Sequence, residues 1–187
     1  MTNFQFIKTN FEGVFLINNF EVIDDRGYLL KDFDQNIFNQ NGLDIFFDET
    51  FESFSFQNVI RGLHFQVNKP QAKLVRVLTG EILDVIVDLR NESITFGKWE
   101  GFKISSLNKN SLFIPKGFAH GFCVLSECAI VSYKCVGKYD KDSDSGIVWN
   151  DEDLNIYWSI NNPVVSERDK KLGTFKEFIE NIKYLEE

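Results

Sequence analysis

The chain has 187 residues, of which 43% are hydrophobic and 15% aromatic, so it can bury the core of one domain. Its formal net charge of −8 argues against nucleic-acid binding, which depends on a surplus of lysine and arginine. Neither a signal sequence nor a run of 18 apolar residues is present, so we expect a soluble, cytoplasmic protein that does not bind membranes.

Short alternating or apolar segments, separated by turn-rich stretches, predict a mostly β protein. Twenty phenylalanines and a single methionine also favour pleated sheet over a helix bundle. In chain order, the expected strands are 13–22, 53–60, 73–80, 81–90, 99–105, 111–115 and 129–136. The pattern is typical of a β-sandwich or barrel.

Helices are expected in only two places. A short one should lie near residues 35–42, and a second over residues 175–185. The second has apolar residues at helical spacing: Phe175, Phe178, Ile179, Ile182 and Leu185. No linker or repeat divides the chain, so residues 1–187 are predicted to form one domain.

The strongest predicted hairpin covers residues 73–90 and turns at Thr79-Gly80. Strand alternation would then put Lys73 and Asp84 on the same face as diagonal neighbours, among apolar residues. Buried charges need partners, so the two form either a structural ion pair or part of a polar pocket.

The chain contains two histidines, His64 in RGLHFQ and His120 in PKGFAH, and the residues alone leave their role open. No spacing supports a metal site, and no GxSxG elbow supports nucleophilic catalysis. The two histidines, Lys73, Tyr133 and Tyr139 are groups that can move a proton beside a carbonyl. Two histidines that simply fill a barrel are the alternative.

Eight segments, in this order, resemble the dTDP-4-dehydrorhamnose 3,5-epimerases over nearly the whole chain. They are FIKTNFEGV, DDRGY, VIRGLHFQ, QAKLVRVLTGEILDVIVDLR, TFGKWEG, LFIPKGFAHGF, SYKC and SGIVWNDEDLNIYW, followed by SERD. The resemblance implies a double-stranded β-helix of the cupin type that needs no metal or other cofactor. It also implies a homodimer formed by strand exchange.

Members of this family invert C3 and C5 of a 4-keto-6-deoxy sugar linked to a nucleoside diphosphate. By resemblance, His64 is the base and Asp169 of SERD orients it. Lys73 would neutralise the enolate oxygen, with Asp84 beside it, and Tyr133 would return a proton from the opposite face. Such a two-sided arrangement is what inversion requires.

The same matching assigns residues that hold the substrate. His120 would donate to sugar oxygens, and Tyr139 would stack on the nucleobase. Arg61 would contact the diphosphate, and Arg26 would be a second arginine that binds the ligand. Arg168 replaces the usual lysine of the closing motif, a mild change.

Larger departures lie at the nucleotide end of the expected site. Lys31 replaces a usual glutamate, while Glu49, Thr50 and Phe51 stand where the family usually has Gln-Asp-Asn. These changes leave open a C3-only or C5-only epimerase that acts on a CDP- or GDP-linked sugar. A sugar-binding cupin without turnover is the alternative from another class.

Overall fold

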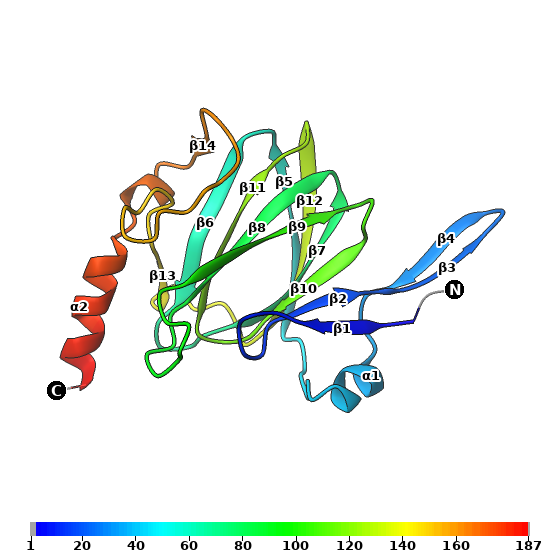
Figure 1. The fold of residues 1–187 in the computed structure, drawn as a ribbon, viewed down its shortest axis with the longest axis horizontal. Helices are drawn as coiled ribbons and strands as arrows, with labels where there is room; N and C mark the ends of the chain where they lie inside the picture. Colours follow the sequence, from blue (N-terminus) through cyan, green and yellow to red (C-terminus); the bar gives the residue numbers. More distant parts are fainter. Residues whose placement is uncertain (1–2, 187) are drawn as a thin grey trace.

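The computed structural model describes residues 3–186, with side chains described as far as residue 181. Two large β-sheets face each other, and a two-stranded arm projects from them (Figure 1). The first sheet has the order β1 (Gln5–Lys8), β2 (Phe15–Asn18), β10 (Asn110–Ile114), β7 (Ala72–Thr79), β12 (Cys128–Val136) and β5 (Glu49–Phe56). The second has the order β13 (Asp144–Gly146), β6 (Val59–Gln66), β11 (Phe118–Val124), β8 (Glu81–Asp88) and β9 (Trp99–Ser105), and β14 (Val164–Val165) also pairs with β6.

From β7 onward the chain passes back and forth between the two sheets: β7, β10 and β12 belong to the first, and the β8–β9 pair, β11 and the short β13 to the second. This is the expected mostly β, double-stranded β-helix. The space between the sheets is filled by apolar residues from both, including Val75, Val77, Ile82 and Ile86. Burial of these side chains is the main force that holds the two sheets face to face.

The predicted hairpin over residues 73–90 is wrong in its pairing. β7 pairs with β10 and β12, and β8 pairs with β9 and β11, so the chain crosses from one sheet to the other at Gly80. A side chain at Gly80 would place its Cβ 2.0 Å from the carbonyl oxygen of Cys128, so the crossing requires glycine. Lys73 and Asp84 still face one interior. Lys73 is two residues from Val75, and Asp84 is two residues from Ile82 and from Ile86, and residues two apart in a strand point to the same face.

Other predicted elements need smaller corrections. The segment 53–60 is divided between β5 and β6, and β11, which was not predicted as a strand, is buried at every position. The helix expected near residues 35–42 is α1 (Gln35–Gln40), whose first turn is capped by the Asp34 carboxylate accepting from the Ile37 N–H.

The C-terminal helix is α2 (Phe175–Glu186), and it covers the outer face of the second sheet. Phe175, Phe178 and Ile179 pack there with Leu154 and Trp158. The side chains of Ile182 and Leu185 lie outside the described residues. No helix within residues 3–186 is long and apolar enough to cross a membrane.

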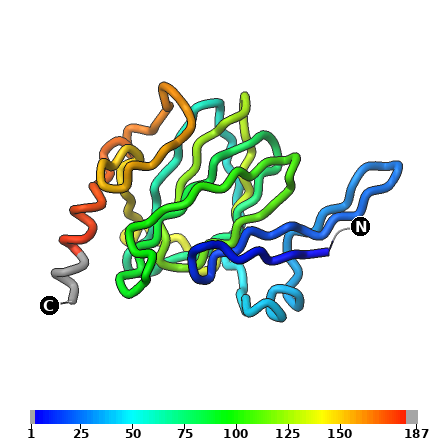
Figure 2. The backbone as a smooth tube through the Cα atoms, viewed as in Figure 1, coloured from blue at the N-terminus to red at the C-terminus, as the bar shows by residue number. Residues whose placement is uncertain are grey.

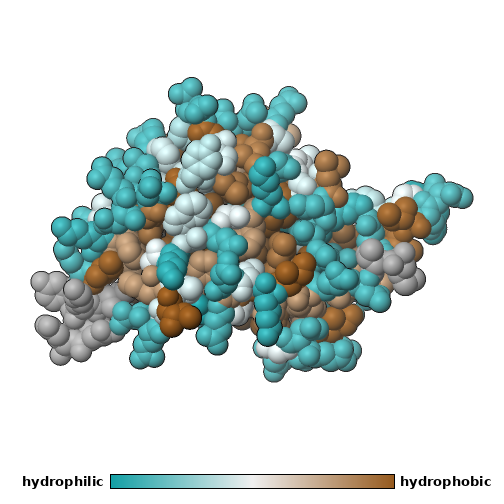
Figure 3. All heavy atoms as spheres, in the orientation of Figure 1, coloured by the Kyte–Doolittle hydropathy of each residue, from teal (hydrophilic) through white to brown (hydrophobic). Residues whose placement is uncertain are grey.

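The arm consists of β3 (Phe20–Asp24) and β4 (Gly27–Lys31), paired only with each other. It extends away from the barrel on the side opposite α2 (Figure 2). Ile23, Tyr28 and Leu29 on this arm are exposed, and apolar atoms are visible there among hydrophilic ones (Figure 3). An exposed apolar hairpin of this kind is a feature of surfaces that bind another chain.

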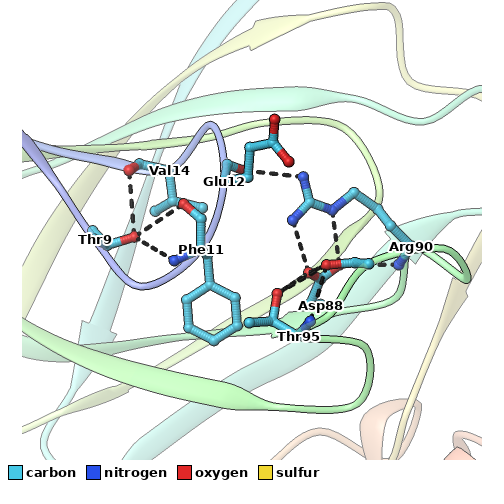
Figure 4. A network of polar contacts seen from close by, with 8 residues as sticks. Thr9, Phe11, Glu12, Val14, Asp88, Arg90 and Thr95 are labelled. Carbon is cyan, nitrogen blue, oxygen red and sulfur yellow. Dashed lines mark hydrogen bonds and ion pairs between the residues drawn. The ribbon is translucent and has the colours of Figure 1, made fainter.

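A buried polar network fixes the end of β8 (Figure 4). The Asp88 carboxylate accepts from the Arg90 guanidinium at 2.7 and 2.8 Å and from the hydroxyls of Ser93 and Thr95 at 2.6 Å. Arg90 also lies over the Phe118 ring, with its guanidinium carbon 4.5 Å from the ring centroid. The network therefore holds Phe118 in place at the floor of the cavity described below.

Candidate active site

A cavity of about 580 Å³ opens between the two sheets at one end of the barrel. It brings together residues that are far apart in sequence and that come from both sheets. Those expected from the sequence are Glu49, Phe51, His64, Lys73, His120, Tyr139 and Arg168. Others, not singled out from the sequence, include Gln71, Gly117, Phe118, Asp144 and Phe178.

A bulge in β6 turns His64 toward this cavity. Arg61 pairs with Phe122 of β11 and His64 pairs with His120, so three steps along β6 match two along β11. Residues three apart in a regular strand point to opposite faces, whereas the bulge puts Arg61 and His64 on the same face. Gly62 makes this possible: its φ is +125°, and a Cβ there would lie 2.6 Å from the Gly121 Cα.

His64 and Asp169 form the hydrogen-bonded pair expected from the sequence. The His64 Nε2 lies 2.9 Å from Oδ1 of Asp169, while Oδ2 accepts from the Gly62 N–H at 3.2 Å. Burial raises the pKa of Asp169, but His64 and the Gly62 N–H outweigh it and hold this pKa below its ordinary value. A carboxylate fixed on Nε2–H leaves Nδ1 as the nitrogen that can accept a proton.

Asp84 has a different partner from the one expected. Both its oxygens lie within 2.9 to 3.0 Å of the His120 Nε2, and both side chains are buried. Lys73 lies close enough to Asp84 for the negative charge of the carboxylate to raise the pKa of the lysine. Burial lowers the pKa of Lys73, and Cys135 and Asp84 partly offset that effect. Lys73 and His120 thus line the cavity, and the Asp84 carboxylate lies behind them in the same cluster.

Tyr133 lies on β12 of the first sheet, whereas His64 lies on β6 of the second. Its side chain points to the interior, where its ring meets the His120 ring edge-on at 6.3 Å and stacks on Phe51 at 4.8 Å. Burial raises the pKa of Tyr133, so the phenol keeps its proton. The base and the proton donor therefore come from opposite sheets, although Tyr133 lies behind Phe51 and His120 and does not itself line the cavity.

The rim of the cavity is tied together by Asp144. Its Oδ2 accepts from the Tyr139 hydroxyl at 3.0 Å and from Nη2 of Arg168 at 2.6 Å, which joins residues 139–144 to the segment that contains Arg168. Glu49 accepts from the Tyr139 N–H at 3.0 Å. The hydrogen bond to Asp144 raises the pKa of Tyr139. No sequence pattern singled out Asp144; Tyr139 is only five residues away, but Arg168 comes from a separate segment that meets Asp144 only in the folded chain.

Three expected site residues, Asp84, Tyr133 and Asp169, contact cavity-lining side chains without lining the cavity themselves. Three further ones, all expected to bind the ligand, lie outside the cavity of a single chain. Arg61 points into the barrel but donates to the Ser55 hydroxyl and to the Phe54 carbonyl, at 2.9 and 3.1 Å. Arg26 lies at the tip of the arm, 90% exposed and paired with the neighbouring Asp24. Lys31, at the base of the arm, pairs with Asp34 at 3.1 Å.

Comparisons with known proteins agree with the geometry. The family model described as dTDP-4-dehydrorhamnose 3,5-epimerase matches residues 8–177. The enzyme of that name from Methanothermobacter thermautotrophicus is 46% identical over 180 residues, which cover 95% of this chain and 97% of that one. The matched range contains His64, Lys73, Tyr133 and Asp169.

Solved structures are similar over the same extent. The Bacillus anthracis 3,5-epimerase, crystallised with TDP and pyrophosphate, is 41% identical with a TM-score of 0.90, covering 92% of this chain and 100% of that one. The Legionella pneumophila 3,5-epimerase in complex with dTDP-4-keto-L-rhamnose is 37% identical, also with a TM-score of 0.90, covering 93% and 94%.

Proposed function

Because the chain belongs to the dTDP-4-dehydrorhamnose 3,5-epimerase family and is thus an isomerase, we propose how its cavity performs the reaction. The substrate is a dTDP-linked 4-keto-6-deoxyhexose, and both carbons next to the ketone, C3 and C5, are inverted. The observation that carries the proposal is the His64–Asp169 pair on the side of the second sheet and the buried Tyr133 on the side of the first.

Each step uses a group with matching chemistry. Nδ1 of His64 removes the proton from the carbon beside the ketone, and Asp169 stabilises the imidazolium that forms. The electron pair moves onto the ketone oxygen, where Lys73 neutralises the enolate. Tyr133 then gives its proton to the opposite face of the carbon, which inverts it. His120, fixed by Asp84, donates to oxygens of the sugar.

Deuterated water tests this mechanism directly. Incubation with dTDP-4-keto-6-deoxyglucose should place deuterium at C3 and C5 of the product, as followed by proton NMR. His64→Ala should abolish exchange at both carbons, since no other base is proposed. Tyr133→Phe should impair inversion more than exchange. If neither C3 nor C5 exchanges in the unaltered protein, the assignment of this substrate is wrong.

A different nucleotide is the second candidate, and the cavity rim favours testing it. Glu49 and Phe51 line the cavity where the family usually carries amides, and a carboxylate prefers a ligand with hydrogen-bond donors. Thermal unfolding with dTDP, UDP, CDP and GDP distinguishes the two, because a ligand that binds only the folded state raises its apparent stability. The largest shift with CDP or GDP would support the second candidate.

We further propose that residues 1–187 act as one domain and that two copies form a homodimer through the arm. Arg26 lies far out on the arm, and the apolar residues Ile23, Tyr28 and Leu29 are exposed beside it. In a dimer these residues would be covered, and Arg26 would reach a phosphate in the cavity of the partner chain.

Light scattering after size-exclusion chromatography tests the dimer. The protein should elute with twice the mass of one chain, and Leu29→Asp should shift it toward the monomer, because a charge would be buried in the interface. Ile94→Asp is the control, since Ile94 is 94% exposed on a loop away from the arm. A monomeric protein at high concentration would contradict the proposal.

A further inference from the structure

Phe51 covers the proton donor of the proposed reaction. It lies directly across the β5–β12 strand pair from Tyr133, and the two rings are nearly parallel, with their centroids 4.8 Å apart and their planes at 18°. Phe51 is 51% exposed and lines the cavity, whereas Tyr133 is only 6% exposed. The ring of Phe51 therefore covers one face of the Tyr133 ring on the side of the cavity.

We propose that Phe51 is a positioning residue that holds the Tyr133 ring for proton delivery, and so decides how often proton removal ends in inversion. The inference rests on the proposed epimerase function and deepens it. The family usually has asparagine at this position, and an amide cannot supply an aromatic stack. Phe51 would act through Tyr133 and not through a polar contact with the substrate.

The stack matters because it is the closest ring contact of Tyr133, on the side of the ring that is turned away from the apolar core. The other aromatic contact of Tyr133 is the edge of His120, whose centroid is 6.3 Å away at an interplanar angle of 73°. Stacked and edge-on contacts at these distances each favour one ring position by a factor of roughly two to ten. A donor that moves by about 1 Å loses up to a hundredfold in rate. Loss of Phe51 would remove the closer of these two aromatic contacts.

The charge environment of Tyr133 supports the same role. Burial raises the pKa of its phenol, and the nearby Ser53 hydroxyl and Arg61 act against that shift. Titratable or charged groups face it from every neighbouring element: Asp84 on β8, Arg61 on β6, His120 on β11, Cys135 on β12, and Lys73 and Glu49 as the strand partners of Cys135. Removing Phe51 admits water to the ring, so the pKa of Tyr133 should fall toward that of a free tyrosine.

The test compares exchange with inversion in the same reaction. In deuterated water with dTDP-4-keto-6-deoxyglucose, NMR gives both the deuterium that enters recovered substrate and the rate at which epimer forms. Phe51→Ala should lower inversion relative to exchange by about tenfold. Phe51→Tyr keeps a stacking ring and should stay near the unaltered protein. Phe46→Ala, which removes a phenylalanine exposed outside the cavity, should change neither rate.

A second measurement needs no substrate. The difference between the ultraviolet titrations of the protein and of Tyr133→Phe gives the ionisation of the Tyr133 phenol alone. The difference between Phe51→Ala and the Phe51→Ala, Tyr133→Phe double variant gives the same ionisation without Phe51, and it should occur at lower pH. If Phe51→Ala is folded and raises KM while the ratio of inversion to exchange is unchanged, Phe51 is a binding surface only and the proposal is overturned. If the unaltered protein exchanges nothing, the proposed function fails, and the titration alone then decides the role of Phe51.

Discussion

Replacing Gly62 with alanine tests whether the β6 bulge is what places the base. The new Cβ would lie 2.6 Å from the Gly121 Cα and 2.9 Å from the His120 carbonyl oxygen, both of them backbone atoms that cannot rotate away. A non-glycine residue at φ +125° costs about 1–3 kcal/mol in strain. Forcing β6 and β11 apart costs about 1–3 kcal/mol more. Gly62→Ala should therefore lower the free energy of unfolding by about 2–6 kcal/mol.

Gly27 supplies a matched control for the strain alone. Its φ is +121°, close to that of Gly62, but a Cβ there would meet nothing within 4 Å. Gly27→Ala should therefore carry only the conformational cost of about 1–3 kcal/mol. Urea unfolding measures both variants, and the slope of the transition shows whether unfolding remains two-state. Equal destabilisation by the two substitutions would refute the steric argument.

The same substitution should also act on catalysis. His64 pairs with His120 directly beside the contact that Gly62→Ala would open, so the imidazole would move relative to Lys73 and Tyr133. A displacement of about 1 Å reduces the rate up to a hundredfold. Deuterium exchange that is unchanged in a folded Gly62→Ala protein would mean that the bulge does not position the base.

Three further outcomes are expected. Asp169→Asn should retain the fold but lower exchange by about a thousandfold, since an amide cannot stabilise the His64 imidazolium; a tenfold loss or less would argue against the pair. Asp88→Asn should cost about 2 kcal/mol at pH 6, while the exposed Asp24→Asn, also two residues before an arginine, should cost almost nothing. Hydrogen bonds outweigh burial and lower the pKa of Asp88 from 3.8 to about 2, so its stabilising effect is present above pH 4 and lost as the pH falls through 2. A difference in free energy of unfolding between the protein and Asp88→Asn that is as large at pH 2 as at pH 6 would contradict this explanation. Lys73→Met should abolish exchange yet raise the urea midpoint, because burial lowers the pKa of Lys73 and the charged form therefore destabilises the fold at neutral pH; a lower midpoint would show that the charge is well paired.

Local patterns in the sequence predict which face a side chain takes, but not which strand lies beside it. Alternation correctly put Lys73 and Asp84 in one interior, although the hairpin assumed for them does not exist. Strand pairing depends on the direction that the chain takes at Gly80, and packing between the two sheets determines that direction. The His64–Asp169 pair was predicted only through the family resemblance, since 105 residues separate its members.

Contacts made across the cavity escaped prediction for the same physical reason. Asp84 with His120, and Asp144 with Arg168, each join elements that meet only in the folded chain. Phe51 was expected to touch the substrate because of its place in a motif. Its stacking on Tyr133 follows from the β5–β12 register, which a single sequence does not contain.

Two histidine–aspartate pairs lie in one cavity, and their exposure distinguishes their roles. The His64 side chain is 28% exposed, with one ring nitrogen held by Asp169 and the other available to the cavity. The His120 side chain is only 5% exposed, and its Nε2 is held by both oxygens of a carboxylate that is fully buried. A base must reach a carbon of the substrate and exchange its proton with solvent, whereas a donor that orients the sugar needs only to stay fixed. If the roles were reversed, His120→Ala would abolish exchange and His64→Ala would mainly raise KM. The geometry predicts the opposite pattern, so measuring both variants side by side tests the assignment without reference to any relative.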